Sequence, residues 1–340
     1  MTRVRFWALI CVAMLVTLIM LVPKRIEGFE EGTKETIFVS IASYRDAECM
    51  TTLHDIFSKA KDPTRIFVGI CEQNTKSKKE QCVPMEFTHH DNVRKISIPN
   101  TEAKGPCYAR YLCSTLYRNE TYFMQIDSHT TFVQDWDIKA IKALKDCPSQ
   151  KAVLSGYPHD TTVYTIDEES VPVLCDSSWN DDGLPQFKAT IKQKKDFKNG
   201  PAPIPFTSGG FIFAPGSILR DVPYDPNLPH LFQGEEILYS ARAWTHGYDF
   251  FTAPVNIVLH KYYRKEDPKF WNDIQEWNTE QKRSVQRARR ILGLEEPIIQ
   301  PGEEPYALGT VRSITAYWKF SGLDPQTKTS KSKEKFCSLA

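Results

Sequence analysis

Short apolar runs alternate with helical segments between residues 36 and 154, and few folds accommodate that order. Each run has the length of a buried strand, and a helical or polar stretch separates it from the next one. A chain that repeats strand and helix forms a mainly parallel sheet with helices on both of its faces. We therefore predict strands at 37–42, 65–70, 93–98, 122–126 and 152–154, with helices at 49–60, 106–117 and 135–144.

The second half of the chain has a less regular pattern. Residues 160–205 are polar, and a connection of this length in a compact domain is usually functional or disordered. Beyond them we predict a strand at 208–214, a helix at 234–247, a strand at 255–260 and a long charged helix at 268–292. Residues 36–325 are thus predicted to form one folded domain, and the Ser- and Lys-rich residues 326–340 a disordered tail.

An uncharged apolar run, Phe6–Val22, precedes this domain. The run is short for a membrane-spanning helix but longer than the apolar part of a usual signal peptide, and no small-residue cleavage site follows it. We predict an uncleaved transmembrane anchor, with residues 1–5 as a cytoplasmic tail and 23–35 as a stem. Because most of the chain follows this short span, we expect a type II protein of the Golgi or ER membrane with a lumenal domain. A cleaved signal peptide is the alternative.

Charge and motif content exclude several classes of protein. Lys and Arg total 43 against 42 Asp and Glu, so no broad positive surface for nucleic acid is expected. No GxGxxG follows the first predicted strand and no GxxxxGK[ST] occurs, so a dinucleotide fingerprint and a P-loop are both absent. The nine cysteines form no CxxC, which leaves a zinc ribbon or a thioredoxin-type site without support.

Disulfides are compatible with a lumenal domain. Cys107 and Cys113 fall in one predicted helix, where six residues rise about 9 Å along the axis. That separation exceeds what a disulfide spans, so we expect these two cysteines not to pair with each other.

Asp127-Ser128-His129 directly follows the apolar run 122–126. A strand that ends in Asp-x-His places a carboxylate and an imidazole at the carboxyl edge of the sheet, where open α/β sheets bind their ligands. These two groups suit a divalent metal such as Mn²⁺, which could neutralise a bound diphosphate. An ordinary loop containing Asp and His is the competing interpretation.

Two further segments combine a possible binding role with an ordinary structural one. The polar residues Ser40, Ser43, Tyr44, Arg45 and Asp46 at the end of the first predicted strand could hold a ribose or a base, although Asp46 could simply cap the helix that follows. Arg110 lies in the first turns of a predicted helix, where a guanidinium can bind phosphate oxygens. A surface arginine is the plain alternative for that position.

Two acids and a histidine complete the candidate set. Glu235 and Glu236 open a predicted helix, where they either complement the helix dipole or hold the hydroxyls of a sugar. His260 ends an apolar strand and is either a core histidine or a third metal ligand. Glu235 continues the apolar stripe of its helix, so we expect it rather than Glu236 to face the pocket.

Six segments, in this order, resemble the family of protein-modifying N-acetylglucosaminyltransferases: IASYRD, GPCYARYL, YFMQIDSHTTFVQDWD, SGGFIFAPG, GEEILYSARAWTHGYDFFTAP and VLHKYYR. That family includes the cytoplasmic hydroxyproline enzyme and the Golgi polypeptide enzymes of protists. The chain is similar, more remotely, to animal polypeptide N-acetylgalactosaminyltransferases, which share an Asp-x-His and an acidic Gly-Glu helix. The resemblance extends from residue 36 to residue 322.

The resemblance implies a GT-A type nucleotide-sugar transferase, a single Rossmann-like domain that binds a UDP-sugar through Mn²⁺ or another divalent cation and retains the anomeric configuration. By motif position, it implies a metal site formed by Asp127, His129 and His260. It further implies that Glu235 or Glu236 holds the donor sugar or the acceptor.

The nucleotide side of the site follows from the same resemblance. Its motifs imply that Ser43, Tyr44 and Arg45 line a uridine pocket, and that Arg110 meets the uridine or the diphosphate. Gly209 and Gly210, from the SGGFIFAPG segment, are implied to belong to the same donor-binding site.

Together these expectations describe an enzyme that transfers N-acetylglucosamine from UDP-GlcNAc to a Thr or Ser hydroxyl of a polypeptide in the secretory pathway. A hydroxyproline acceptor and another UDP-sugar donor are the nearest alternatives. A non-catalytic lumenal sugar-binding protein is a third, which an intact metal set disfavours. A metal-assisted hydrolase is the fourth, and donor hydrolysis without acceptor preference would identify it.

Overall fold

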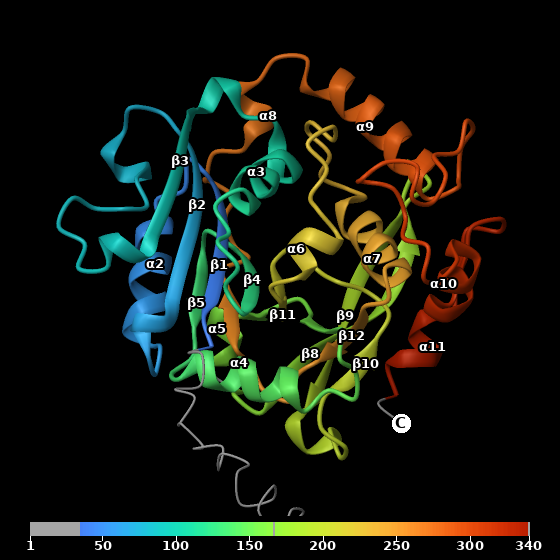
Figure 1. The fold of residues 1–340 in the computed structure, drawn as a ribbon, viewed down its shortest axis with the longest axis horizontal. Coiled ribbons are helices and arrows are strands. Elements are labelled where there is room, and N and C mark those ends of the chain that lie inside the picture. The colour runs from blue at the N-terminus through green and yellow to red at the C-terminus, as the bar shows by residue number, and fades with distance from the viewer. Residues whose placement is uncertain (1–34, 166, 339–340) are drawn as a thin grey trace, which may run out of the picture. The chain divides into compact units, whose positions relative to one another are not determined.

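An eight-stranded sheet forms the core of the part of the chain that the computed structural model describes, residues 35–165 and 167–338 (Figure 1). The strands run in the order β10-β12-β6-β11-β4-β1-β2-β3. Their bounds are β1 Ile37–Tyr44, β2 Ile66–Asn74, β3 Val93–Pro99, β4 Tyr122–Asp127, β6 Ala152–Ser155, β10 Ala202–Ile204, β11 Phe211–Pro215 and β12 Asp249–Thr252. All five strands predicted in the first half of the chain are therefore present.

The sheet is mixed, which corrects the expectation of a mainly parallel one. β1 pairs in parallel with β2 and β4, β2 with β3, and β6 with β12. β11 lies antiparallel between β4 and β6, with Phe213 opposite both Met124 and Leu154, and β10 is antiparallel to β12. The strand–helix alternation that predicts parallel pairing covers only the first half of the chain, whereas β10 and β11 come from the second half.

Alternate side chains of the strands enter two separate cores, one on each face of the sheet. In β1, Ile37, Val39 and Ile41 pack into one core, and Phe38 packs into the other. Successive side chains of a strand point to opposite faces, so a strand buried on both faces is mostly apolar, as β1 and β4 are. The continuous apolar runs of the sequence thus reflect helices on both sides of the sheet.

The helices divide between these two cores. Residues of α2 (Cys49–Ser58) and α4 (Trp136–Lys145) belong to the core that contains Ile37, and residues of α3 (Gly105–Ser114), α7 (Glu235–Thr245), α9 (Trp277–Ile291) and α10 (Ile314–Ser321) belong to the core that contains Phe38. In Figure 1, α2 and α10 accordingly lie on opposite sides of the strands. Two short helices, α5 (Thr161–Tyr164) and α6 (Ile218–Asp221), complete the connections.

A small three-stranded sheet brings distant segments together beside the end of β4. It consists of β5 (Thr130–Phe132), β7 (His159–Asp160) and β13 (Val258–His260). β13 is antiparallel to β5, and His260 is the register partner of Thr130. This pairing places the end of β13 next to the residues that directly follow β4.

Two predicted segments differ from expectation. The polar residues 160–205 include a long antiparallel hairpin, β8 (Ser170–Trp179) and β9 (Pro185–Gln193), rather than an irregular connection. The predicted helix 268–292 is divided into α8 (Phe270–Asp273) and α9, because Ile274 is extended and Glu276 has a φ of 60°. These two residues lie outside helical geometry, so the long helix cannot continue through them.

The expected disordered tail at 326–340 is incorporated in the fold as far as residue 338. It forms β15 (Thr329–Ser330), which pairs antiparallel with β14 (Leu323–Asp324) just before it, and α11 (Ser332–Phe336). A disulfide joins Cys337 to Cys175 of β8, and the Ser332 hydroxyl donates to the Ser321 carbonyl at 2.6 Å. The Ser- and Lys-rich composition suggested disorder, but a disulfide between residues 162 positions apart fixes this segment against β8.

A second disulfide joins Cys49 and Cys82. Cys107 and Cys113 are free and buried, so they do not pair with each other, as their helical spacing predicts. Among the described residues, no helix is long and apolar enough to cross a membrane. The predicted anchor at 6–22, the tail at 1–5 and nearly all of the stem at 23–35 lie outside the described residues.

Candidate functional site

A cavity of about 450 Å³ opens where β1 and β4 end. Nine of the expected site residues line it: Tyr44, Arg110, Asp127, His129, Gly209, Gly210, Glu235, Glu236 and His260. Ser43 and Arg45 are the two expected residues that are not among its lining. The carboxyl edge of the sheet is therefore where the candidate residues meet, as the strand order predicts.

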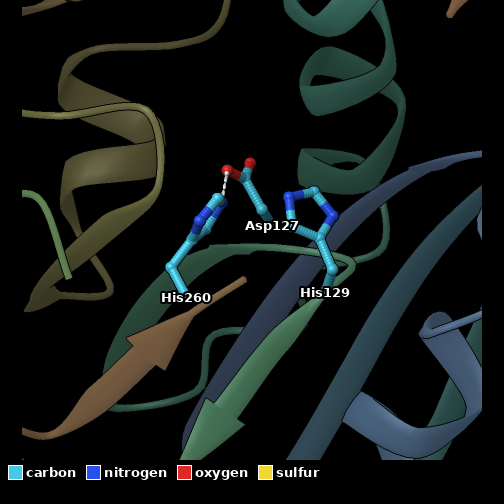
Figure 2. A group of neighbouring side chains, drawn as sticks. All are labelled: Asp127, His129 and His260. Carbon is cyan, nitrogen blue, oxygen red and sulfur yellow. Dashed lines mark hydrogen bonds and ion pairs between the residues drawn. The ribbon is translucent and has the colours of Figure 1, made fainter. Parts of the chain in front are cut away.

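Asp127, His129 and His260 converge at this cavity (Figure 2). Each offers one ligand atom, and these atoms all lie within 4.8 Å of one another. His260 Nε2 lies 3.1 Å from Asp127 Oδ2, and the two imidazole centroids are 4.5 Å apart. The backbone in Figure 2 explains why the three side chains meet. Asp127 ends β4, His129 follows in the turn before β5, and β13, which pairs with β5, carries His260.

The charge of this cluster suits a divalent cation. Burial raises the pKa of Asp127, but the hydrogen bond with His260 and the charges of His129 and Arg110 outweigh burial and lower it well below its usual range. Asp127 is therefore a carboxylate at neutral pH. One carboxylate and two imidazoles within reach of one point form a ligand set that fits Mn²⁺ or a related metal.

Arg110 ties the metal cluster to the start of α7. Its Nη2 donates to the Gly209 carbonyl at 2.9 Å and lies 3.3 Å from Asp127 Oδ1, and its Nη1 forms an ion pair with Glu235. The arginine is only 6% exposed, so its charge is balanced by these carboxylates rather than by water. Arg110 is thus a part of the cavity wall and not an ordinary surface residue.

The two acids at the start of α7 have different partners. Glu236 accepts hydrogen bonds from the Gly209 amide at 2.8 Å and from the Tyr157 hydroxyl at 2.7 Å. Burial raises the pKa of Glu236, although these two donors oppose the rise. Both acids line the cavity, so the apolar stripe of α7 does not single out Glu235 as the acid that faces the pocket. Residues 237–245 are all buried, and the helix therefore has no exposed face that would point one acid away from the cavity.

The residues at the end of β1 alternate between the cavity and the interior. Ala42, Tyr44 and Asp46 line the cavity, whereas Ser43 between them is completely buried. Arg45 turns away to form ion pairs with Asp273 at 2.7 Å and Glu80 at 3.2 Å. Consecutive residues of a strand point to opposite faces, so three residues in a row could not all have lined one pocket.

The sequence suggested a ribose- or base-binding role or a helix cap for Asp46, not a contact with His129, and gave Arg264 no role. Asp46 accepts from His129 Nδ1 at 2.9 Å, from the Ser128 hydroxyl at 2.6 Å and from Arg264 at 3.1 Å. Burial raises the pKa of Asp46, but His129 and Arg264 outweigh it and lower the pKa to about 2. Asp46 ends the segment IASYRD and Arg264 ends the segment VLHKYYR. Their place in two family-like segments was the sequence signal that could have identified them as site residues.

Comparison with solved structures gives a likeness of fold. The structure of GalNAc-T7 with UDP, GalNAc and Mn²⁺ has a TM-score of 0.53 and 14% identity, over 69% of this chain and 45% of that one. S. aureus TarS 1–349 in complex with UDP-GlcNAc gives 0.46 and 15%, over 68% and 60% of the two chains. The mannosyltransferase PcManGT from Pyrobaculum calidifontis, with GDP-Man and Mn²⁺, gives 0.44 and 12%, over 68% and 58%. Only the first of these likenesses bears on the fold.

This chain spans about half the length of the GalNAc-T7 chain that it matches. A search of curated proteins gives no match. Residues 36–89 and 77–327 match the family described as "Glycosyltransferase (GlcNAc)", which accounts for almost all of the described domain. The chain therefore belongs to this glycosyltransferase family, and its domain has a GT-A-like α/β fold with a mixed sheet.

Proposed function

We propose that this chain transfers N-acetylglucosamine from UDP-GlcNAc to a Thr or Ser hydroxyl of a polypeptide, with retention of the anomeric configuration. The family description supports a GlcNAc donor. The GalNAc-T7 structure, which contains UDP, GalNAc and Mn²⁺, supports a UDP-sugar and a divalent metal. The observation that carries the proposal is the meeting of Asp127, His129 and His260 beside Arg110 in one cavity.

The roles of these residues follow from their charges. Asp127, His129 and His260 would hold Mn²⁺, which when bound offsets the negative charge that builds on the leaving diphosphate. Arg110 is held close to Asp127 and presents a guanidinium to the same cavity, where a preorganised cation stabilises developing charge without reorganisation. Glu235 and Glu236 line the same cavity and can accept hydrogen bonds from sugar hydroxyls.

We further propose that the domain works in the lumen of the Golgi or ER, held by an anchor at residues 6–22. The disulfides Cys49–Cys82 and Cys175–Cys337 support an oxidising compartment. Protease treatment of sealed microsomes tests this placement. The domain should survive without detergent and be degraded with it, and degradation without detergent would favour a cytoplasmic domain.

A UDP-release screen tests the reaction. The full-length chain is assayed with Mn²⁺, UDP-GlcNAc, UDP-GalNAc or UDP-glucose, and matched peptides that carry Thr, Ser, hydroxyproline or Ala at one position. We expect release that depends on UDP-GlcNAc and on a Thr or Ser peptide, and an α-linked product by NMR. The Asp127→Ala variant is the control for metal-dependent turnover.

Each other result selects a different function. Release with the hydroxyproline peptide alone would identify the alternative acceptor, and release with another donor would change the sugar. UDP release that is equal with the Ala peptide would indicate a hydrolase. Binding of UDP-GlcNAc without any release would indicate a non-catalytic sugar-binding protein.

A further inference from the structure

His129 is engaged at both of its ring nitrogens. Nδ1 lies 2.9 Å from Asp46 Oδ2, and Nη1 of Arg264 lies 3.0 Å from Nε2. A guanidinium has donors only, so Nε2 must be the acceptor and Nδ1 must donate to the carboxylate. This geometry directs the lone pair of His129 Nε2 at Arg264.

Asp46 holds both partners of this arrangement. Its Oδ2 accepts from His129, from the Ser128 hydroxyl and from Nη2 of Arg264, and the residue is 2% exposed. A buried carboxylate behind a metal-binding histidine fixes the tautomer and the orientation of the ring. Here the same carboxylate also places a cation beside the nitrogen through which the ring would bind a metal.

We propose that Arg264 is a positioning residue that occupies His129 Nε2 until a divalent metal such as Mn²⁺ displaces it. This inference rests on the proposed function, because it takes Asp127, His129 and His260 as the metal ligands. One lone pair cannot accept from Arg264 and bind a metal at the same time. The two are therefore mutually exclusive at this atom, and Arg264 lowers the affinity of the site for the metal.

The segment that carries Arg264 allows this exchange. Residues 261–269 connect β13 to α8 without helix or strand, and Tyr263 next to Arg264 is 75% exposed. The guanidinium also forms an ion pair with Asp267, Nε to Oδ2, at 2.6 Å. After it leaves Nε2, Arg264 therefore still has Asp267 and Asp46 as partners, and its charge is not left unpaired.

Mn²⁺ affinity of the full-length chain, measured by calorimetry or electron paramagnetic resonance without donor or acceptor, tests the proposal. Arg264→Gln should bind Mn²⁺ about fivefold more tightly or better, because the competing charge-assisted hydrogen bond is lost. Lys261→Gln is the matched control. It removes a positive charge from the same segment, where Lys261 pairs with Glu48 at 2.6 Å, and it should change the affinity by less than about twofold.

The outcomes separate this inference from the proposed function. If neither the unmutated chain nor Arg264→Gln binds Mn²⁺, both are overturned. If the unmutated chain binds Mn²⁺ but Arg264→Gln binds equally or more weakly, or if Lys261→Gln gains as much affinity, only the role of Arg264 is overturned.

Nitrogen NMR of the metal-free chain gives a readout that does not involve metal. His129 should show the proton on Nδ1, and the Nε2 resonance should shift in Arg264→Gln because the ring loses its donor. A proton on Nε2 in the unmutated chain would contradict the proposal.

Discussion

The Tyr157 hydroxyl donates a hydrogen bond to Glu236 Oε2 at 2.7 Å, so a neutral group holds one of the two acids at the start of α7. The neighbouring Glu235 is paired with the charged Arg110 instead. Two consecutive glutamates of one helix thus have different partners, one a neutral hydroxyl and the other a guanidinium. Their substitutions should consequently have opposite effects on stability.

Glu236→Gln is expected to raise the melting temperature at pH 7. Burial raises the pKa of Glu236 above its usual 4.5, so its contribution to stability is complete below pH 4.5 and is lost as pH rises through the folded-state pKa. A neutral amide avoids that loss and can still bond to Gly209 and Tyr157. The gain over the unmutated chain should therefore grow from pH 4 to pH 7 in thermal melts.

Glu235→Gln is the matched variant and should destabilise by roughly 1–3 kcal/mol, because it leaves the buried Arg110 with one carboxylate fewer. Equal effects of the two substitutions, in sign and size, would show that the environments of the acids do not differ.

Turnover should also separate the two acids. We expect Glu235→Gln to reduce kcat far more than Glu236→Gln, because it removes the charge that positions Arg110 beside Asp127. UDP affinity should stay nearly unchanged in both variants, since neither acid is expected to contact the nucleotide and Arg110 keeps its contacts with Gly209 and Asp127. Steady-state kinetics and UDP titration check this, and an inactive Glu236→Gln with an active Glu235→Gln would contradict it.

Removal of the metal or of its ligands should abolish activity without unfolding the domain. Asp127→Ala and His129→Ala should each lose more than about 100-fold in kcat/KM, beyond the range typical for residues that only orient a ligand. His260→Ala should raise the Mn²⁺ concentration needed for half-maximal activity. His90→Ala, at an exposed position outside the cavity, is the control.

Circular dichroism of the same variants should show an unchanged fold. Full activity of the unmutated chain in excess EDTA would contradict a metal site at Asp127, His129 and His260.

Asp137 supports a pH-dependent prediction away from the cavity. It accepts from the amides of Lys61 and Asp62 and from Arg65 at 2.7 Å, and its side chain is fully buried. Burial raises the pKa of Asp137, but these donors outweigh burial and hold it below 3.8. Its stabilising contribution is therefore present above pH 3.8 and is lost as pH falls through the folded-state pKa.

Asp137→Asn should cost about 3 kcal/mol at pH 7, because it breaks a buried ion pair. The difference from the unmutated chain should shrink below pH 3.8 in chemical denaturation. Asp146→Asn removes only an exposed pair with Lys142 and should change stability by less than about 1 kcal/mol. A cost at Asp137 that does not depend on pH would contradict the argument.

Local pattern determined much of this protein. The apolar runs of β1, β2, β4 and β6 were predictable because a strand buried on both faces must be mostly apolar along its length. The Asp-x-His at the end of β4 was predictable as part of a site because strand ends gather at one edge of the sheet. That Cys107 and Cys113 do not pair with each other followed from helical geometry alone.

Tertiary structure decided what depends on contacts between distant residues. The sheet was wrongly predicted to be mainly parallel, because no local sequence pattern shows that β11 pairs antiparallel with β4. The tail was wrongly predicted to be disordered, because no local pattern shows that Cys337 pairs with Cys175. Asp46 and Arg264 meet at His129 across 218 residues, and only the fold brings them together. Sequence patterns report the environment of each residue along its own element, whereas the partners of a buried charge come from whichever elements pack beside it.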